Sequence, residues 1–204
     1  DLKESCLRSE TTVKVFDQMR KLQGFTDEGS PGRDWNVATG MVIEGKAGFQ
    51  IMGDWAKGEF TAAGKVPGVD YYCAATPSNN GYLYNVDSFI FYKSSDPDKQ
   101  AGQKLLAKLM MGKNFQKVFN LYKGSIPARL DVSMDEFDKC AKTSNADIKT
   151  AGASGGLVPS FAHGMAQGNT MKAALQDIIT EHFNSDMSSV DAANALADSV
   201  LANM

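Results

Sequence analysis

The 204-residue chain is long enough for one sizeable domain or two small ones, and its 43% apolar and 22% charged residues are typical of a globular protein. The net charge of -3 argues against nucleic acid as a partner, because neutralising phosphates requires a basic surface. No apolar run approaches the roughly 20 residues of a membrane-spanning helix.

Two helices are predicted before the first strand. Residues 35–44 form the second of them, with Trp35 interpreted as a packing residue. Residues 9–22 form the first, because apolar side chains recur there at helical spacing and Gly24 follows as a helix stop. Its apolar stripe consists of Val15, Phe16, Met19 and Leu22.

Three short apolar runs are predicted to be buried strands: residues 47–52, 71–75 and 88–92. Gly53 follows the first run and permits a sharp turn, which places Trp55 just past the strand end. Ligands of α/β sheets bind outside the carboxyl ends of the strands, so the Trp55 ring is a candidate ligand plate. Taken alone, Trp55 is equally well interpreted as a core residue, because tryptophan buries a large apolar area wherever it lies.

The rest of the chain is predicted to be mostly helical. Asp96 followed by Pro97 is a strong helix start, and Ser188 with Asp191 three residues on marks another. The expected helices are residues 96–111, 114–122 (ended by Gly124), 171–183 and a final one from 188, with a helical turn at 135–140 and a small polar loop at 145–156. This helix-rich pattern with a few buried strands predicts an α/β fold.

Four polar residues in predicted loops accompany Trp55 as candidates for a ligand site: Asn85, Asp87, Lys123 and His163. An aromatic ring stacks on the apolar C–H face of a pyranose, and these polar groups can saturate its hydroxyls as donors and acceptors. The set therefore predicts a sugar site. Plainer interpretations stay open: a loop carboxylate bonded to backbone amides, a turn amide and a solvated lysine at a helix end. The other histidine, His182, is expected at the surface.

Residues 40–47 match the spacing G-x-x-x-x-G-K of a phosphate-binding loop, but the match is rejected. Ala47 stands where such a loop needs Ser or Thr for magnesium, and the run precedes a predicted strand instead of following one. No cofactor is expected. The cysteines Cys6, Cys73 and Cys140 include no C-x-x-C pair, so a zinc site is unsupported, while all three pairings and three free thiols remain open.

Several strings around these residues resemble the glucose/mannose-type periplasmic binding proteins of ABC sugar importers, a family of extracellular solute-binding proteins that includes maltose-binding protein. The order and spacing of the five candidate residues fit this subfamily. The strings are Gly53-Asp54-Trp55, Asn85-Val86-Asp87-Ser88, Lys123-Gly124-Ser125-Ile126-Pro127-Ala128-Arg129 and Ala162-His163-Gly164-Met165.

The resemblance implies a type II periplasmic-binding-protein fold with two lobes, of which this chain looks like the C-terminal half. Residues 1–87 and 123–204 are then expected in the C-terminal lobe, and residues 88–122 largely in the N-terminal lobe. The N-terminal half would be absent, and a missing segment or a second copy of the chain would cover the exposed faces. The resemblance also favours a Cys73–Cys140 disulfide.

The function that the resemblance implies is a non-enzymatic, periplasmic receptor that holds a monosaccharide such as glucose between two lobes. Its partners would be the sugar and the membrane subunits of an ABC transporter. The alternative is a glycoside hydrolase, which needs two carboxylates flanking a glycosidic bond. Asp54 and Asp87 are the only pair near the predicted site.

Overall fold

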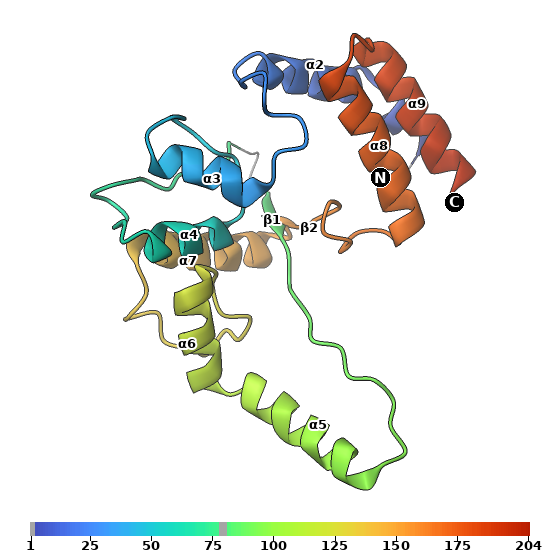
Figure 1. Ribbon diagram of the computed structural model, residues 1–204. Helices are drawn as coiled ribbons and strands as arrows, with labels where there is room; N and C mark the ends of the chain where they lie inside the picture. The colour runs from blue at the N-terminus through green and yellow to red at the C-terminus, as the bar shows by residue number, and fades with distance from the viewer. Residues whose placement is uncertain (1–2, 78–80) are drawn as a thin grey trace. The chain divides into compact units, whose positions relative to one another are not determined.

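The computed structural model describes residues 3–77 and 81–204, and its described part is built mainly from helices (Figure 1). The chain divides into two compact units: unit 1 comprises Asp1–Arg33 and Pro159–Met204, and unit 2 comprises Asp34–Val158. The helix-rich expectation is confirmed. Within the described ranges, regular strands are limited to one two-stranded sheet.

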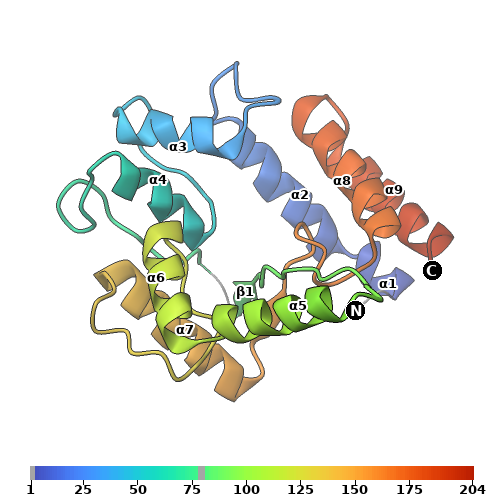
Figure 2. The same ribbon diagram turned by 60° about the horizontal axis from the view of Figure 1, so that its bottom comes forward.

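Unit 1 is a helical unit in which α2 and α8 both pack against α9 (Figures 1 and 2). Phe16 of α2 is buried against Ala192 and Ala193 of α9, whose small side chains let the two helices approach closely. Met171 and Leu175 of α8 pack on Val200 of α9. The helices are α1 (Glu4–Leu7), α2 (Glu10–Gln23), α8 (Asn169–Asn184) and α9 (Ser189–Ala202).

Side-chain caps start two of these helices, and the predicted cap at Ser188 is confirmed. The Ser9 hydroxyl accepts a hydrogen bond from the backbone N–H of Thr12, and the Ser188 hydroxyl accepts one from Asp191 at 3.1 Å. The predicted apolar stripe of α2 is wrong in part. Val15 is 55% exposed, whereas Val13 packs beside Phe16, because the helix turns the Phe16 face towards the alanines of α9.

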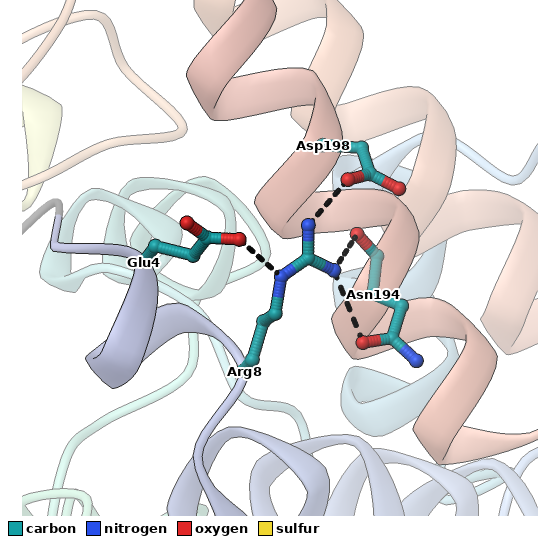
Figure 3. Close-up of polar contacts among 4 residues, drawn as sticks. All are labelled: Glu4, Arg8, Asn194 and Asp198. Carbon is teal, nitrogen blue, oxygen red and sulfur yellow. Dashed lines mark hydrogen bonds and ion pairs between the residues drawn. The ribbon is translucent and has the colours of Figure 1, made fainter.

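Arg8 fastens α1 to α9 (Figure 3). Its guanidinium donates to Glu4 Oε1 at 2.9 Å within α1, to Asn194 Oδ1 at 3.2 Å, and to Asp198 Oδ1. The planar guanidinium of an arginine has five N–H donors, so it can donate to several acceptors at once. The amino-terminal helix is thereby tied to the carboxyl-terminal one.

The expected surface position of His182 is wrong, because its side chain is fully buried in unit 1. The ring meets Phe16 edge-on with centroids 4.8 Å apart, and Nε2 lies 3.4 Å from the Ser189 hydroxyl. The helical spacing of the sequence indicates this burial. His182 follows Ile178 by four residues and Ile179 by three, on the apolar face of α8.

The remaining elements begin in unit 2, and they follow the predicted helix boundaries closely up to residue 123. Asp96 caps α5 by accepting from the N–H groups of Asp98 and Lys99, and Gly124 ends α6 in a left-handed conformation. The elements are α3 (Trp35–Ile43), the 3-10 turn η1 (Asp54–Ala56), α4 (Lys57–Ala62), β1 (Tyr82–Tyr84), α5 (Pro97–Met110), α6 (Lys113–Lys123), α7 (Lys139–Ser154) and β2 (Leu157–Pro159).

The three predicted buried strands are wrong. Residues 47–52 and 88–92 form no strand, and Phe49 and Ile90 are 95% and 79% exposed. Residues 71–75 contribute one isolated bridge, between Tyr71 and Pro67. An apolar run becomes a strand only where a neighbour accepts its backbone hydrogen bonds, and in the described residues the paired strands are β1 and β2 instead.

The predicted loop at 145–156 and the separate turn at 135–140 are also wrong, since α7 runs from Lys139 to Ser154. The Asp138 carboxylate caps its start by accepting from the N–H of Ala141, and Gly155 ends it with φ of 72°. The small residues of this segment are compatible with a helix, because alanine is the best helix former. Ala141 and Ala151 are buried, which their small side chains allow.

The Cys73–Cys140 disulfide is confirmed, with a Cα–Cα separation of 5.7 Å. It joins the segment after the Tyr71 bridge to the first turn of α7, both in unit 2. Cys6 is a free, exposed thiol.

Candidate functional site

Trp55 lies in η1, the turn that begins at Asp54 directly after the extended residue Gly53. A Cβ atom at Gly53 would lie only 2.2 to 2.5 Å from three carbons of the indole ring, so the ring folds back over a backbone that has no side chain. Trp55 is partly exposed. Because Gly53 has no side chain, the Trp55 ring can pack on the backbone at Gly53 and remain partly exposed to solvent.

The end of α6 approaches the start of α4 at two glycines. A Cβ atom at Gly58 would lie 2.8 Å from the carbonyl oxygen of Lys123, and one at Gly124 would lie 2.5 Å from the nitrogen of Gly58. Gly124 also has a φ of 87°, which side chains disfavour. This close contact brings the Lys123 backbone against the helix that follows Trp55.

The side chain of Lys123 forms an ion pair with Asp87 Oδ2. Asn85 Nδ2 donates to the other carboxylate oxygen of Asp87 at 3.1 Å, so an amide, a carboxylate and an ammonium form one connected group. The Lys123 ammonium also lies 5.8 Å from the centre of the Phe119 ring. Asp87 remains 62% exposed, so the group lies at the surface of unit 2.

Asp54 is a further acidic residue close to this group. Burial raises the pKa of its carboxyl, while the positive charges of Lys57 and Lys123 and the backbone N–H groups of Ile126 and Trp55 lower it. Burial raises the pKa of the Tyr82 phenol in β1, the hydrogen bond with Ser144 lowers it, and the nearby charge of Asp54 raises it. The Tyr82 and Ser144 hydroxyls share a hydrogen bond of 2.6 Å, and Tyr82 lies outside the predicted strands and the predicted site.

His163 belongs to unit 1, whereas the other candidates belong to unit 2. Its Nδ1 is 2.7 Å from the hydroxyl of Ser160, a residue only 3% exposed, while the imidazole itself is at the surface. The structure thus brings Asn85, Asp87 and Lys123 into contact and places Trp55 on a neighbouring element. It anchors His163 separately through a buried serine.

The described residues contain no group of three or more His, Cys, Asp or Glu side chains that could hold a metal ion. Across those same residues, no helix combines the length and apolar character needed to cross a membrane. An exposed carboxylate, amide and ammonium donate to and accept from hydroxyls, and an indole ring offers an apolar face.

Residues 1–150 match the family model described as bacterial extracellular solute-binding protein. A probable sugar-binding periplasmic protein of Brucella suis biovar 1 is 46% identical over 201 residues, which are 98% of this chain and 48% of the relative. A protein of the same name from Rhizobium meliloti is 42% identical with the same two coverages.

A more distant relative is an uncharacterized ABC transporter extracellular-binding protein of Pyrococcus horikoshii. It is 33% identical over 172 residues, 84% of this chain and 38% of the relative. The chain spans about half the length of the curated relatives it matches first.

Proposed function

We propose, from the premise that this chain belongs to the bacterial extracellular solute-binding proteins, that it takes part in binding a sugar for an ABC transporter. The observation that carries the proposal is the connected group Asn85–Asp87–Lys123 beside the element that holds Trp55. The names of the relatives, which describe sugar-binding periplasmic proteins, support it.

The proposed binding mode follows from these side chains. The Trp55 ring stacks on the C–H face of the sugar, and the Asn85–Asp87–Lys123 group takes up its hydroxyls. Each charge-assisted hydrogen bond contributes about 1.5 to 3 kcal/mol. His163, whose ring is held by Ser160, is proposed as a sugar-binding residue on the ground of the family resemblance. The ligand is a monosaccharide such as glucose, bound in the periplasm without chemical change.

The lobes are proposed as the resemblance implies, within a type II periplasmic-binding-protein fold. Residues 1–87 and 123–204 belong to one lobe, and residues 88–122 largely to the other. Exposed apolar side chains in the latter segment support this division, since isolated proteins rarely leave many large ones in water. They include Ile90 (79% exposed), Tyr92 (82%), Leu105 (70%) and Leu109 (60%). A further polypeptide segment or a second copy would cover them, and transporter membrane subunits would receive the loaded protein.

A glycoside hydrolase is less well supported. It would use Asp54 and Asp87 as the two carboxylates. The names of the relatives describe sugar-binding proteins and so favour a receptor. Turnover of chromogenic glycosides that disappears in Asp87→Asn would reverse the order of the two candidates.

The direct test is isothermal titration of a hexose and pentose panel into a polypeptide of the relatives' length that carries this sequence. Trp55→Ala is expected to abolish measurable binding, and Asp87→Asn to weaken it by about 10- to 150-fold, which corresponds to one charge-assisted bond. Trp35→Ala is the matched control, because Trp35 lies in α3 and is not among the proposed sugar-binding residues. Absence of heat with every sugar, from folded protein, would overturn the proposal.

A further inference from the structure

Lys57 is a buried lysine at the first position of α4, with a side chain only 8% exposed. Its ammonium forms an ion pair with Asp138 Oδ2 at 2.8 Å. A buried ammonium is unfavourable unless it is paired, because it has lost its hydration. The position of the Lys57 side chain is therefore set by where Asp138 lies.

Asp138 is in turn fixed by α7. Its other oxygen, Oδ1, accepts from the N–H of Ala141 at 2.9 Å and caps that helix. Two residues on, Cys140 is bonded to Cys73, which ties the same turn to another segment of unit 2. The Lys57–Asp138 pair thus joins the start of α4 to a helix end that a cap and a disulfide hold rigid.

The main chain of Lys57 lies between two of the proposed sugar-binding residues. Trp55 precedes it by two residues in η1. On the other side, a Cβ atom at Gly124 would lie 3.1 Å from both the carbonyl carbon and the Cβ of Lys57, so the residue after Lys123 packs directly on Lys57. A shift of Lys57 would move the indole ring and the end of α6 together.

We propose that Lys57 is a positioning residue for sugar binding: its ion pair with Asp138 sets the indole of Trp55 and the ammonium of Lys123 in their mutual arrangement. Lys57 does not touch the sugar in this proposal and acts through the two residues that do. The proposal rests on the proposed function for its sugar readout. Its structural part, the immobilisation of the Trp55 ring, does not depend on any ligand.

The first test uses this chain with Trp35→Phe, which leaves Trp55 as the sole tryptophan of the two in the sequence. Lys57→Met removes the charge and keeps the length of the side chain, and Asp138→Asn removes the charge and keeps an oxygen for the α7 cap. Fluorescence anisotropy and acrylamide quenching of Trp55 are measured well below the unfolding transition. Both variants are expected to lower the anisotropy and increase quenching.

Lys117→Met is the matched control. Lys117 belongs to α6, and its ammonium pairs with Glu136 Oε1 at 2.7 Å. The Lys117 side chain is 30% exposed, whereas that of Lys57 is 8% exposed. This variant is expected to leave the Trp55 signal unchanged. If Lys57→Met does not fold, Asp138→Asn decides the question by itself. Folded variants with an unchanged Trp55 signal would show that the pair only stabilises the unit, and the proposal would be wrong.

The second test measures sugar affinity in the longer polypeptide. Lys57→Met and Asp138→Asn are each expected to raise Kd by about tenfold or more, Lys117→Met by less than about twofold, and the double variant no further than either single one. Additive losses, or unchanged Kd, contradict the positioning role. A wild-type polypeptide that binds no sugar overturns the proposed function instead, while the fluorescence test still decides the role of Lys57.

Discussion

His182 is fully buried inside unit 1. Burial lowers the pKa of the imidazole, the nearby charge of Arg20 lowers it further, and Asp17 acts in the opposite direction. Nε2 reaches the Ser189 hydroxyl, but Nδ1 has no hydrogen-bond partner among the described residues. A protonated ring would need acceptors for both N–H groups, so protonation opposes folding.

The sign of the resulting pH dependence follows from linkage. The unfolded state, with the ordinary pKa near 6.5, binds the proton more readily than the folded state. Stability is therefore greatest above about pH 6.5 and falls as pH drops towards the lower folded pKa. Urea unfolding at pH 7.5 and 5.5 is expected to show this loss in the wild type and a smaller one in His182→Gln. Equal losses in both proteins would assign the effect to other groups.

The contact between α4 and α6 depends on a backbone without side chains. Gly124 ends α6 in a left-handed conformation, and its amide donates to the carbonyl of Asn120 at 2.9 Å. The opposing Gly58 leaves room for the carbonyl of Lys123. Two helices can approach this closely only where neither presents a Cβ atom, so Gly58 and Gly124 determine where the end of α6 lies against α4.

Gly124→Ala is expected to lower the free energy of unfolding by about 2 to 4 kcal/mol, because it combines a disfavoured φ with a clash against α4. Gly155→Ala separates the two causes, since Gly155 has a φ of 72° and a Cβ there would meet nothing within 4 Å. That control is expected to lose only about 1 kcal/mol. Chemical denaturation of both variants measures the difference, and equal losses would mean that the α4–α6 contact is loose.

The disulfide of unit 2 constrains the chain over a sequence separation of 67 residues. In the chain-entropy model, closing a loop of this length lowers the entropy of the unfolded state and so stabilises the folded state by about 4 kcal/mol. The segments it encloses include the Asn85–Asp87–Lys123 group and all of α5 and α6. A bond of this kind persists outside the reducing cytoplasm, which agrees with the periplasmic relatives.

Thiol titration of the denatured, non-reduced chain is expected to find one reactive group, Cys6, and to find all three cysteines after reduction. Replacing Cys73 and Cys140 together by serine is expected to lower the free energy of unfolding by about 2 to 4 kcal/mol. Cys6→Ser is the control and should leave stability unchanged, since Cys6 is exposed. Three reactive thiols before reduction would exclude the bridge.

The sequence predicts Asn85, Asp87 and Lys123 as three separate polar candidates, and the structure joins them by a hydrogen bond and an ion pair. Lys57 carries no such signal in the sequence, because a lysine that starts a helix is usually solvated. Only its pairing with Asp138, 81 residues away in sequence, makes it a buried residue.

By itself, the sequence determined the helices whose start and stop signals lie within a few residues, such as α2 after Ser9, α5 after Asp96 and α9 after Ser188. A cap and an apolar period act locally, so they can be read locally. Only the tertiary structure decided the fate of the extended runs, the burial of His182 and the length of α7. Strand pairing and burial depend on a partner elsewhere in the chain, and a run such as residues 88–92 has the same apolar composition whether a neighbour covers it or not.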